Sequence, residues 1–454
     1  MKKYDVIIIG FGKGGKTLAG KFASEGKKVA LIEKDEKMYG GTCINVGCIP
    51  SKSLVNSSQV PHSHSRRSFR DMTTFYKDSI EEKEKLVTML RNKNYYKLHD
   101  MKLVDVIHGE ASFLSTHEVQ VVMSEEPLEL EAEQIIINTG ATPVILPIKG
   151  IPGNPFVYTS ASLMDCSTLP KHLVIVGGGY IGLEFASIYN GLGSEVTVLQ
   201  NEDMLILRED RDMAAAIQES LEAKGVIFKL GAQIHSIDAE KDFAVVSYAW
   251  DRREHKLPGE AILLATGRKP NIEGLHLENA GIKTTARGAI EVNDKLQTNI
   301  PNIWAIGDVN GGLQFTYISL DDSRIVWSAL HNQDYDRQLR KAVPYSVFLS
   351  PSFSRVGLNE DEARNGGYDF RVVKMPAAAI PKAQVLGKTT GLLKAIIDNK
   401  TDKILGCMLF CEESHEMINI VKLALDMDMP YQMLRDQVFT HPTMSEALND
   451  LFSL

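Results

Sequence analysis

The sequence has few cysteines, no excess of basic residues and no long apolar run. Only five of its 454 residues are cysteines, and no uninterrupted apolar stretch approaches the roughly 20 residues that span a bilayer. Lys and Arg number 50 against 58 Asp and Glu, which gives a net charge of −8. We therefore expect no disulfide framework, no nucleic-acid partner and no membrane partner, and we predict a cytoplasmic location.

The length and composition predict several domains. With 44% apolar residues over 454 positions, the chain is long enough for about three domains, each with a core of its own. The first apolar stretch, YDVIIIG at 4–10, ends in glycine after a few residues. This pattern is typical of a buried strand and not of a secretion signal.

Two segments share one pattern of strand, glycine-rich turn, helix and strand. The first covers 4–34 and the second covers 172–200. Such βαβ units bind dinucleotides when a GxGxxG turn places backbone N–H groups against a pyrophosphate. The turns contain Gly10, Gly12 and Gly15 in the first copy, and Gly177, Gly179 and Gly182 in the second.

The residue that ends the second strand differs between the copies. Glu33 and Gln200 each stand 23 residues after the first glycine of their turn. A carboxylate at this position accepts hydrogen bonds from a ribose 2′-OH, whereas glutamine carries no charge that would select for or against a 2′-phosphate. The first unit is thus predicted to bind a dinucleotide, and the choice between NADH and NADPH at the second unit stays open.

Cys43 and Cys48 lie in GGTCINVGCIPSK, directly after the first unit. A metal site would need further ligands, and no second cysteine pair or close Cys/His set supplies them, so no metal site is predicted. The favoured interpretation is a redox-active pair, in which a helix N-terminus and the nearby Lys52 stabilise a thiolate.

Four motifs carry a resemblance that runs over essentially the whole chain. They are GGTCINVGCIPSK, GGGYIGLEFA, NIWAIGDV and HPTMSEAL, in this order. Together they resemble the pyridine nucleotide–disulfide oxidoreductase family, which includes glutathione reductase, lipoamide dehydrogenase and mercuric reductase. Further stretches, such as GFGKGGKTLA and CEESHEMINIVK, are similar to its bacterial reactive-chlorine-resistance flavoproteins, the hypothiocyanous acid reductases.

The resemblance implies an α/β fold with two Rossmann-like dinucleotide-binding domains, for FAD and NAD(P), and a C-terminal α+β dimerisation domain. The expected boundaries are 1–150 for the first part of the FAD domain, 151–272 for the NAD(P) domain, 273–340 for the return of the FAD domain, and 341–454 for the interface domain. A homodimer is implied, in which His441 completes the active site of the partner subunit.

The resemblance also implies roles for individual residues. The FAD site would comprise Gly10, Gly12, Gly15, Glu33, Lys34, Gly41, Thr42, Lys52, Ala111, Thr139, Gly140, Asp308, Gln314, Phe315 and Thr316. The NAD(P)H site would comprise Gly177, Gly179, Tyr180, Gly182, Gln200 and Gly267, with Tyr180 as an aromatic gate over the nicotinamide pocket. The catalytic set would be Cys43, Cys48, Lys52, Glu184, His441 and Glu446.

Within that set, Cys48 would face the flavin and Cys43 would meet the substrate. Lys52 and Glu184 would form an ion pair beside the flavin, and His441 with Glu446 an acid–base pair.

The predicted reaction is reduction of a small oxidant, hypothiocyanous acid, at the expense of NADH or NADPH. Alternatives are a reductase of a glutathione- or lipoamide-type disulfide, a Cu(II) or Hg(II) reductase, and a flavoprotein redox sensor. The mercuric alternative is weakened because the chain shows no N-terminal metal-binding domain and ends LFSL without a cysteine pair.

Other segments are assigned simpler roles. The polar stretch 61–100 is compatible with a helix, and 144–170, rich in Pro, Gly and Ser, is predicted to be a linker. His62 and His64 are expected to have no specific function. The remaining cysteines are expected to be buried as small hydrophobic residues: Cys166, Cys407 and Cys411.

Overall fold

The computed structural model describes residues 1–59, 68–123 and 126–454, so the prediction for His62 and His64 lies outside the described residues. Two compact units are present. Unit 1 comprises 1–53, 78–145 and 266–340, and unit 2 comprises 54–77, 146–265 and 341–454. The helices α3 (Cys48–Gln59) and α4 (Phe69–His99) each contain residues of both units. The helical prediction for 61–100 is therefore confirmed over 69–99.

Unit 1 is built on a mixed sheet whose central strands are parallel. In the sheet, β3-β2-β1-β6-β5-β4 are neighbours in this order, and β17 also pairs with β6. β1 pairs in parallel with β2 and β6, whereas β5 is antiparallel to β6. The strands are β1 (Lys2–Ile9), β2 (Val29–Glu33), β3 (Val104–His108), β4 (Glu110–Phe113), β5 (Glu118–Val122), β6 (Leu128–Ile137) and β17 (Ile303–Ala305).

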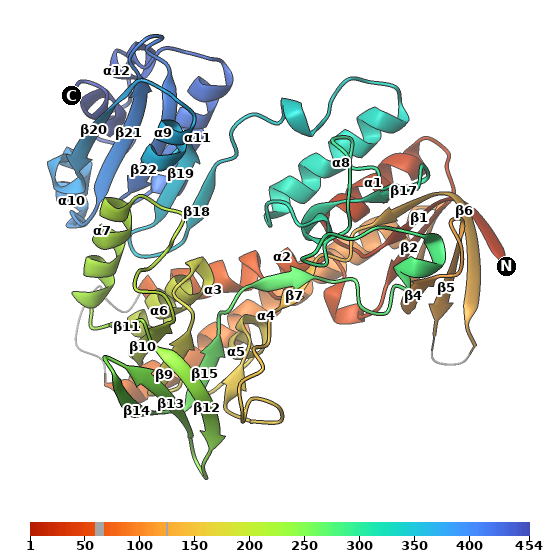
Figure 1. Ribbon diagram of the computed structural model, residues 1–454, viewed down its shortest axis with the longest axis horizontal. Coiled ribbons are helices and arrows are strands. Elements are labelled where there is room, and N and C mark those ends of the chain that lie inside the picture. Colours follow the sequence, from red (N-terminus) through yellow and green to blue (C-terminus); the bar gives the residue numbers. More distant parts are fainter. Residues whose placement is uncertain (60–67, 124–125) are drawn as a thin grey trace. The chain divides into compact units, whose positions relative to one another are not determined.

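Both faces of this sheet are buried, which explains the continuous apolar run of β1. Ile8 packs in the core formed with α1 (Lys13–Ser24) and α8 (Thr316–Leu330), whereas Ile7 packs in a second core on the opposite face. Figure 1 shows α1 and α8 side by side over the sheet of unit 1. The turn after β1 is thereby fixed at the carboxyl end of a central strand, where ligands bind in open α/β sheets.

The remaining elements of unit 1 are short. A two-stranded antiparallel ribbon joins β7 (Ala141–Pro143) to β16 (Arg268–Pro270). The short helices are η1 (Glu36–Met38), α2 (Thr42–Asn45), η3 (Leu277–Ala280), η4 (Gly307–Asn310) and η5 (Arg337–Leu339).

Unit 2 contains a second parallel sheet, in the order β11-β10-β9-β15-β8. A three-stranded antiparallel sheet, β12-β13-β14, follows β11 in the chain. The strands are β8 (Val157–Tyr158), β9 (His172–Val176), β10 (Glu195–Gln200), β11 (Ile227–Leu230), β12 (Gln233–Ala239), β13 (Ala244–Trp250), β14 (Arg253–Gly259) and β15 (Ala261–Leu264). The helices are α5 (Ser160–Met164), α6 (Tyr180–Gly191) and α7 (Arg211–Glu222).

The predicted linker at 144–170 is partly wrong, because it contains β8 and α5. Val157 and Tyr158 pair in parallel with β15 at the edge of the sheet. Thr159 then caps α5 through a reciprocal capping box with Ser162, which stabilises even this short helix. The Ser-rich composition indicated a loop, but here it supplies the cap.

The C-terminal part of unit 2 is an antiparallel sheet covered by helices. The strand order is β18-β19-β22-β21-β20. The strands are β18 (Tyr345–Val347), β19 (Phe353–Gly357), β20 (Phe370–Pro376), β21 (Leu392–Asp398) and β22 (Ile404–Phe410). The helices are α9 (Glu360–Asn365), η6 (Ala377–Ala379), α10 (Pro381–Leu386), α11 (Ser414–Asp426), α12 (Gln432–Arg435) and α13 (Ala447–Leu451).

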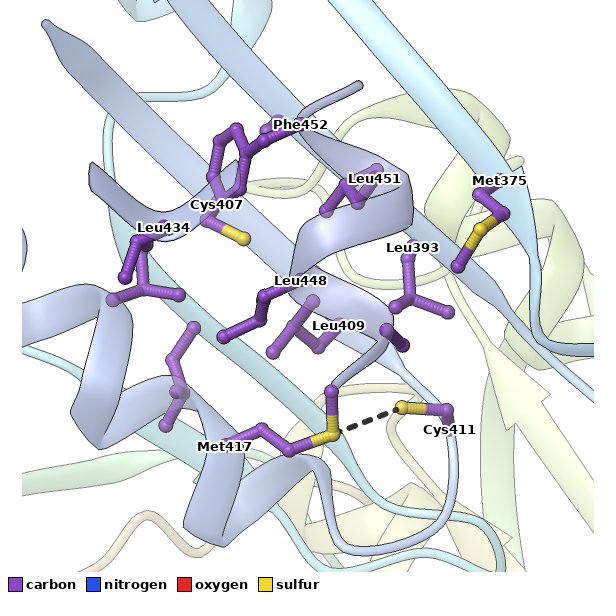
Figure 2. Close-up of a cluster of buried hydrophobic side chains, with 14 of the residues drawn as sticks. Met375, Leu393, Cys407, Leu409, Cys411, Met417, Leu434, Leu448, Leu451 and Phe452 are labelled. Carbon is purple, nitrogen blue, oxygen red and sulfur yellow. Dashed lines mark hydrogen bonds between the residues drawn. The ribbon is translucent and has the colours of Figure 1, made fainter. Parts of the chain in front are cut away.

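Cys407 and Cys411 belong to the core beneath these helices. Figure 2 shows both cysteines among leucines, methionines and Phe452 of this core, with the Cys411 thiol 3.8 Å from the Met417 sulfur. Burial raises the pKa of both thiols, so they stay neutral and unreactive. The prediction of buried small hydrophobic residues is confirmed for these two. It is wrong for Cys166, which is half-buried in the loop after α5.

The fold class predicted from the sequence is confirmed: two α/β sheets with parallel central strands, each with a glycine-rich turn, precede a C-terminal α+β part. Among the helices in the described ranges, none is both long and apolar enough to cross a bilayer.

Candidate active site

The turn after β1 has room only for glycine. Gly10 has φ +104°, and a Cβ there would lie 2.4 Å from the backbone oxygen of Asn138. A Cβ on Gly12 would lie 2.5 Å from the Asn138 side-chain oxygen, and one on Gly15 would lie 2.7 Å from the Gly10 oxygen. The backbone at the start of α1 is therefore bare, as a pyrophosphate at a helix N-terminus requires.

Asn138 organises this turn and was not identified from the sequence. Its side chain accepts a hydrogen bond from Gly15 N–H (2.9 Å) and donates to Ile306 O (2.9 Å) and Ser319 Oγ (3.3 Å). A polar residue at the end of the apolar run IIIN was the available signal, because a buried amide needs several partners.

Glu33 ends β2 beside the same turn. Its carboxylate accepts a hydrogen bond from Phe11 N–H at 3.0 Å. Burial raises its pKa, and backbone N–H groups, that of Phe11 foremost, oppose the rise. The neighbouring Lys34 points to solvent and lies 3.6 Å from a Glu110 oxygen. The turn and Glu33 thus form one continuous surface at the end of β1 and β2.

Asp308 lies on η4, directly after β17. Burial raises the pKa of its carboxyl group, and the charge of Arg268 opposes the rise. Arg268 itself donates to the backbone oxygen of Ala141. Arg268 was also not identified from the sequence, and its place in TGRKP after a strand was the only signal.

The segment that carries the two cysteines packs on the glycine turn. Gly41 has φ +83°, and a Cβ there would lie 2.8 Å from Gly12 Cα. Thr42 and Cys43 begin α2, and Cys48 is the first residue of the twelve-residue α3. The partial positive charge at a helix N-terminus favours a thiolate at Cys48.

The two thiols contact one another and the start of α8. A side-chain hydrogen bond to Cys48 is the largest cause that raises the pKa of Cys43, followed by burial; Thr316 and the charge of Lys16 oppose the rise. The Cys48 sulfur lies 3.6 Å from Thr316 Oγ1. Cys48 is exposed and Cys43 is half-buried. The Cys48 thiol is therefore oriented towards Thr316, the first residue of α8.

The other residues predicted for this site lie around it in unit 1. Thr139 Oγ1 donates to Asn271 O at 2.7 Å, and Gly140 follows with φ +74°. Ala111 is buried in β4, and Lys52 lies one turn after Cys48 on α3. Gln314 is exposed just before α8, and Phe315 stacks on Tyr317 with ring centroids 5.2 Å apart.

The second glycine turn lies in unit 2 and is more open. Gly177 has φ +111°, and a Cβ on Gly182 would lie 2.0 Å from the Gly177 oxygen. A Cβ on Gly179 would meet no heavy atom within 4 Å. Gln200 Oε1 accepts a hydrogen bond from Gly178 N–H at 2.8 Å, the same kind of contact that Glu33 makes in the first turn.

Tyr180 and Glu184 lie on α6, which this turn begins. Tyr180 is the first residue of the helix. Glu184 is buried, and its carboxylate accepts a hydrogen bond from Phe348 N–H at 2.8 Å. Lys52 belongs to unit 1 and Glu184 to unit 2, so their ion pair stays a prediction. Gly267, with φ +97°, belongs to unit 1 as well.

His441 and Glu446 lie close together near the C-terminus. His441 Nδ1 is 2.8 Å from Glu446 Oε2, and Glu446 also accepts from Thr443 N–H at 3.3 Å. The imidazole side chain is 71% exposed, whereas that of Glu446 is 15% exposed. The carboxylate therefore orients an imidazole whose other nitrogen faces outward.

A thiol pair beside one glycine turn, together with a second glycine turn and an oriented His–Glu pair, defines a dinucleotide-dependent dithiol oxidoreductase. The pyridine nucleotide-disulphide oxidoreductase family matches residues 4–323, and its dimerisation domain matches residues 343–452. The chain belongs to this family and is a flavoprotein disulfide oxidoreductase, as the motifs predicted.

Individual relatives cover the chain from end to end. It is 50% identical to the probable pyridine nucleotide-disulfide oxidoreductase RclA of Escherichia coli, over 100% of both chains. It is 32% identical to a mercuric reductase of Staphylococcus aureus, over 98% of this chain and 81% of the relative. The structure of the HOCl-induced flavoprotein disulfide reductase RclA from Escherichia coli superposes with a TM-score of 0.92 at 49% identity, covering 99% of this chain and 100% of the other.

Proposed function

We propose that this enzyme uses NADH or NADPH and FAD to reduce hypothiocyanous acid to thiocyanate through a Cys43–Cys48 disulfide. The observation that carries the proposal is the hydrogen-bonded pair of Cys43, in α2, and Cys48, at the start of α3, with Thr316 Oγ1 3.6 Å from the Cys48 sulfur. Similarity to an HOCl-induced reductase supports an oxidant as substrate.

The residues of unit 1 fit FAD. Only glycine fits at Gly10 and Gly12, because a Cβ at either position would collide with Asn138, so the backbone there stays free of side chains. Glu33 stands where a ribose hydroxyl is bound, and the half-buried Asp308 fits the ribitol hydroxyls, whose donors would offset its burial. When bound, FAD supplies hydride acceptance from NAD(P)H and two-electron delivery to the disulfide.

The residues of unit 2 fit a nicotinamide dinucleotide. Gly177, Gly179 and Gly182 leave the N-terminus of α6 bare, and Gln200 offers an amide to a ribose hydroxyl. The neutral side chain of Gln200 gives weak discrimination, and the nearby Glu202 and Asp203 would repel a 2′-phosphate. We therefore propose a slight preference for NADH.

The chemistry of the acceptor half is carried by side chains of this chain. Cys43 attacks the sulfur of hypothiocyanous acid, and the hydroxide leaves as water with a proton from His441. The product is a Cys43–S–SCN adduct. Cys48 then attacks the Cys43 sulfur and expels thiocyanate, which restores the disulfide. Glu446 holds His441 in the orientation needed for the proton transfer.

Dimerisation would complete each site. The chain has the dimerisation domain of its family at 343–452, and we propose a homodimer in which His441 serves the cysteines of the partner subunit. The 71% exposure of His441 in the single chain fits a side chain that acts on another subunit.

A second candidate acceptor is Cu(II). A Cu(II) complex of RclA from Escherichia coli, 49% identical with a TM-score of 0.94, shows that such a dithiol flavoprotein associates with this ion. Two Cu(II) ions would each take one electron from the Cys43–Cys48 dithiol, which becomes the disulfide.

The deciding experiment is NAD(P)H consumption with hypothiocyanous acid, glutathione disulfide, lipoamide, Cu(II) and Hg(II). We expect the largest kcat/KM with hypothiocyanous acid, and a clearly larger value for another acceptor would overturn this substrate. Cys43→Ser should keep FAD and lose acceptor turnover, whereas Cys166→Ser, a matched control outside the pair, should keep both. Slow turnover with every acceptor would favour a redox sensor.

The dimer is tested with two inactive variants. In a mixed dimer of Cys43→Ser and His441→Gln subunits, one site receives both substitutions and the other receives neither. We expect activity to return when the two variants are co-expressed. If His441 serves its own subunit, both sites stay defective and no activity returns.

A further inference from the structure

Glu209 is a fully buried carboxylate to which the mechanism above gives no role. It lies in the loop between β10 and α7, and its side chain has 0% exposure. It accepts a hydrogen bond from the phenol of Tyr180 at 2.5 Å and another from the phenol of Tyr345, and Arg355 Nη1 lies at 3.3 Å. We call these four residues, Tyr180, Glu209, Tyr345 and Arg355, the Glu209 latch.

The charge of Glu209 is compensated by Arg355, which also pairs with Glu362 outside the latch. A buried carboxylate is stable when a cation and hydrogen-bond donors compensate it, and Arg355 is the cation here. Burial and the charge of Glu209 raise the pKa of both phenols, so Tyr180 and Tyr345 remain protonated donors at physiological pH. Glu209 thus holds both rings by charge-assisted hydrogen bonds.

The latch fixes the orientation of Tyr180 from a distant part of the sequence. Tyr180 follows Gly179 at the start of α6, whereas Tyr345 lies in β18 and Arg355 in β19. The ring centroids of Tyr180 and Tyr345 are 5.8 Å apart, and the two ring planes are inclined by 45°. The C-terminal sheet therefore sets the position of the first side chain of the nucleotide-binding helix.

The loop that carries Glu209 is anchored independently of Tyr180. The adjacent Asp210 forms an ion pair with the fully buried Lys394 at 2.6 Å, and an Asp212 oxygen lies 3.0 Å from the same ammonium group. Lys394 also pairs with Glu360. These contacts hold the backbone of Glu209 in place when one of its own donors leaves.

We propose that the hydrogen bond to Glu209 holds the Tyr180 ring closed over the nicotinamide pocket. Tyr345 is the positioning residue that sets how easily the Tyr180 ring moves away. This inference rests on the gate role of Tyr180 in the proposed function. When the nicotinamide displaces the Tyr180 ring, the phenol must leave Glu209. Tyr345 and Arg355 then remain as its partners, and the buried charge is never left uncompensated.

The test measures NAD(P)H-dependent reduction of ferricyanide, a dye that takes electrons from the flavin and does not require the dithiol. Tyr345→Phe removes one partner of Glu209, so Tyr180 leaves it less readily, and we expect KM for NADH to rise about fivefold with kcat and FAD content unchanged. Tyr180→Phe releases the gate, and we expect a lower KM and faster NADH consumption by O₂ without acceptor.

A double variant separates a latch from a merely structural role. In Tyr180→Phe the hydrogen bond to Glu209 is already absent, so adding Tyr345→Phe should not change KM further. A structural defect would shift KM equally in both backgrounds and would overturn the proposal. Tyr248→Phe makes the same change at another buried tyrosine of unit 2, in β13, and is the matched control that should keep the wild-type KM.

Two further outcomes are decisive. If Tyr345→Phe does not fold, Glu209→Gln is measured in its place. The latch would be overturned if both Glu209→Gln and Tyr180→Phe had the wild-type KM for NADH and the wild-type rate of NADH consumption by O₂. Wild-type enzyme that reduces no dye with either nucleotide would overturn the proposed function as well. An unchanged KM in Tyr345→Phe with normal dye reduction would overturn the latch alone.

Discussion

The two glycine turns have the same sequence pattern but different surroundings, and one residue explains the difference. In the first unit Asn138 follows the strand β6, and its side chain lies where a Cβ on Gly12 would be. In the second unit the corresponding position after β15 holds Ala265, and Gly179 has no neighbour within 4 Å of a Cβ. Both residues donate the same backbone hydrogen bond: Asn138 N–H to Ile9 O at 2.7 Å, and Ala265 N–H to Val176 O at 2.8 Å.

This comparison distinguishes a turn closed by the protein from a turn left open. The amide of Asn138 connects α1, Ile306 directly after β17, and α8 around the first turn, which suits a cofactor that stays bound. At the second turn, Ala265 has no side-chain amide that could form such bonds. This turn suits a nucleotide that must enter and leave in every cycle.

The largest effect is expected from alanine at corresponding glycines. In Gly12→Ala the new methyl group collides with Asn138, which must displace the turn that would bind the pyrophosphate, so we expect at least about a tenfold loss of bound FAD. In Gly179→Ala nothing collides, and we expect full FAD content with KM for NADH raised about tenfold. Flavin absorbance and steady-state kinetics measure both. Equal FAD content in the two variants would contradict the distinction.

Asn138→Ala should destabilise unit 1. The substitution leaves Gly15 N–H, Ile306 C=O and Ser319 without their buried partner, which costs about 3 kcal/mol. We expect a lower melting temperature of the FAD-free protein, measured by circular dichroism. Ala265→Asn is the converse change, and we expect little loss of stability but weaker NADH binding, because the amide would occupy the open space near Gly179.

Substitutions of Glu33 and Gln200, which end β2 and β10, test how the charge at these two positions affects nucleotide binding. Glu33→Gln keeps an acceptor for Phe11 N–H but loses the charge, so FAD affinity should fall about tenfold. Gln200→Glu should raise the preference for NADH over NADPH about fivefold, because a carboxylate repels a 2′-phosphate. A wild-type preference for NADPH above about a thousandfold, or roughly 4 kcal/mol, would contradict our interpretation of Gln200.

The smallest effect concerns Lys16 on α1, whose counterpart on α6 is the buried Leu183. Burial lowers the pKa of Lys16 from 10.5 to about 8, with the charges of Lys13 and Lys97 adding to the shift. Between these two pKa values the folded state binds fewer protons than the unfolded state, so stability rises with pH across this window. The melting temperature of Lys16→Met relative to wild type should therefore be most favourable at pH 7 and decline towards pH 10. A difference independent of pH would show that folding does not lower the pKa of Lys16.

The sequence by itself determined the two βαβ units, the family and the pair formed by His441 and Glu446. These conclusions depend on local patterns: GxGxxG can be recognised because glycine alone permits the positive φ of Gly10 and Gly177. His441 and Glu446 are five residues apart, so their contact at 2.8 Å is equally local. A short segment of sequence contains everything that such features need.

Only the tertiary structure decided what surrounds those patterns. Asn138 is 123 residues from Gly15 and 168 from Ile306, and Tyr345 is 136 residues from Glu209. Each of these buried polar groups is stable only because its partners arrive from other strands and helices. No local pattern records which distant residues will compensate a buried amide or carboxylate, so the closed first turn and the Glu209 latch became visible only in the folded chain.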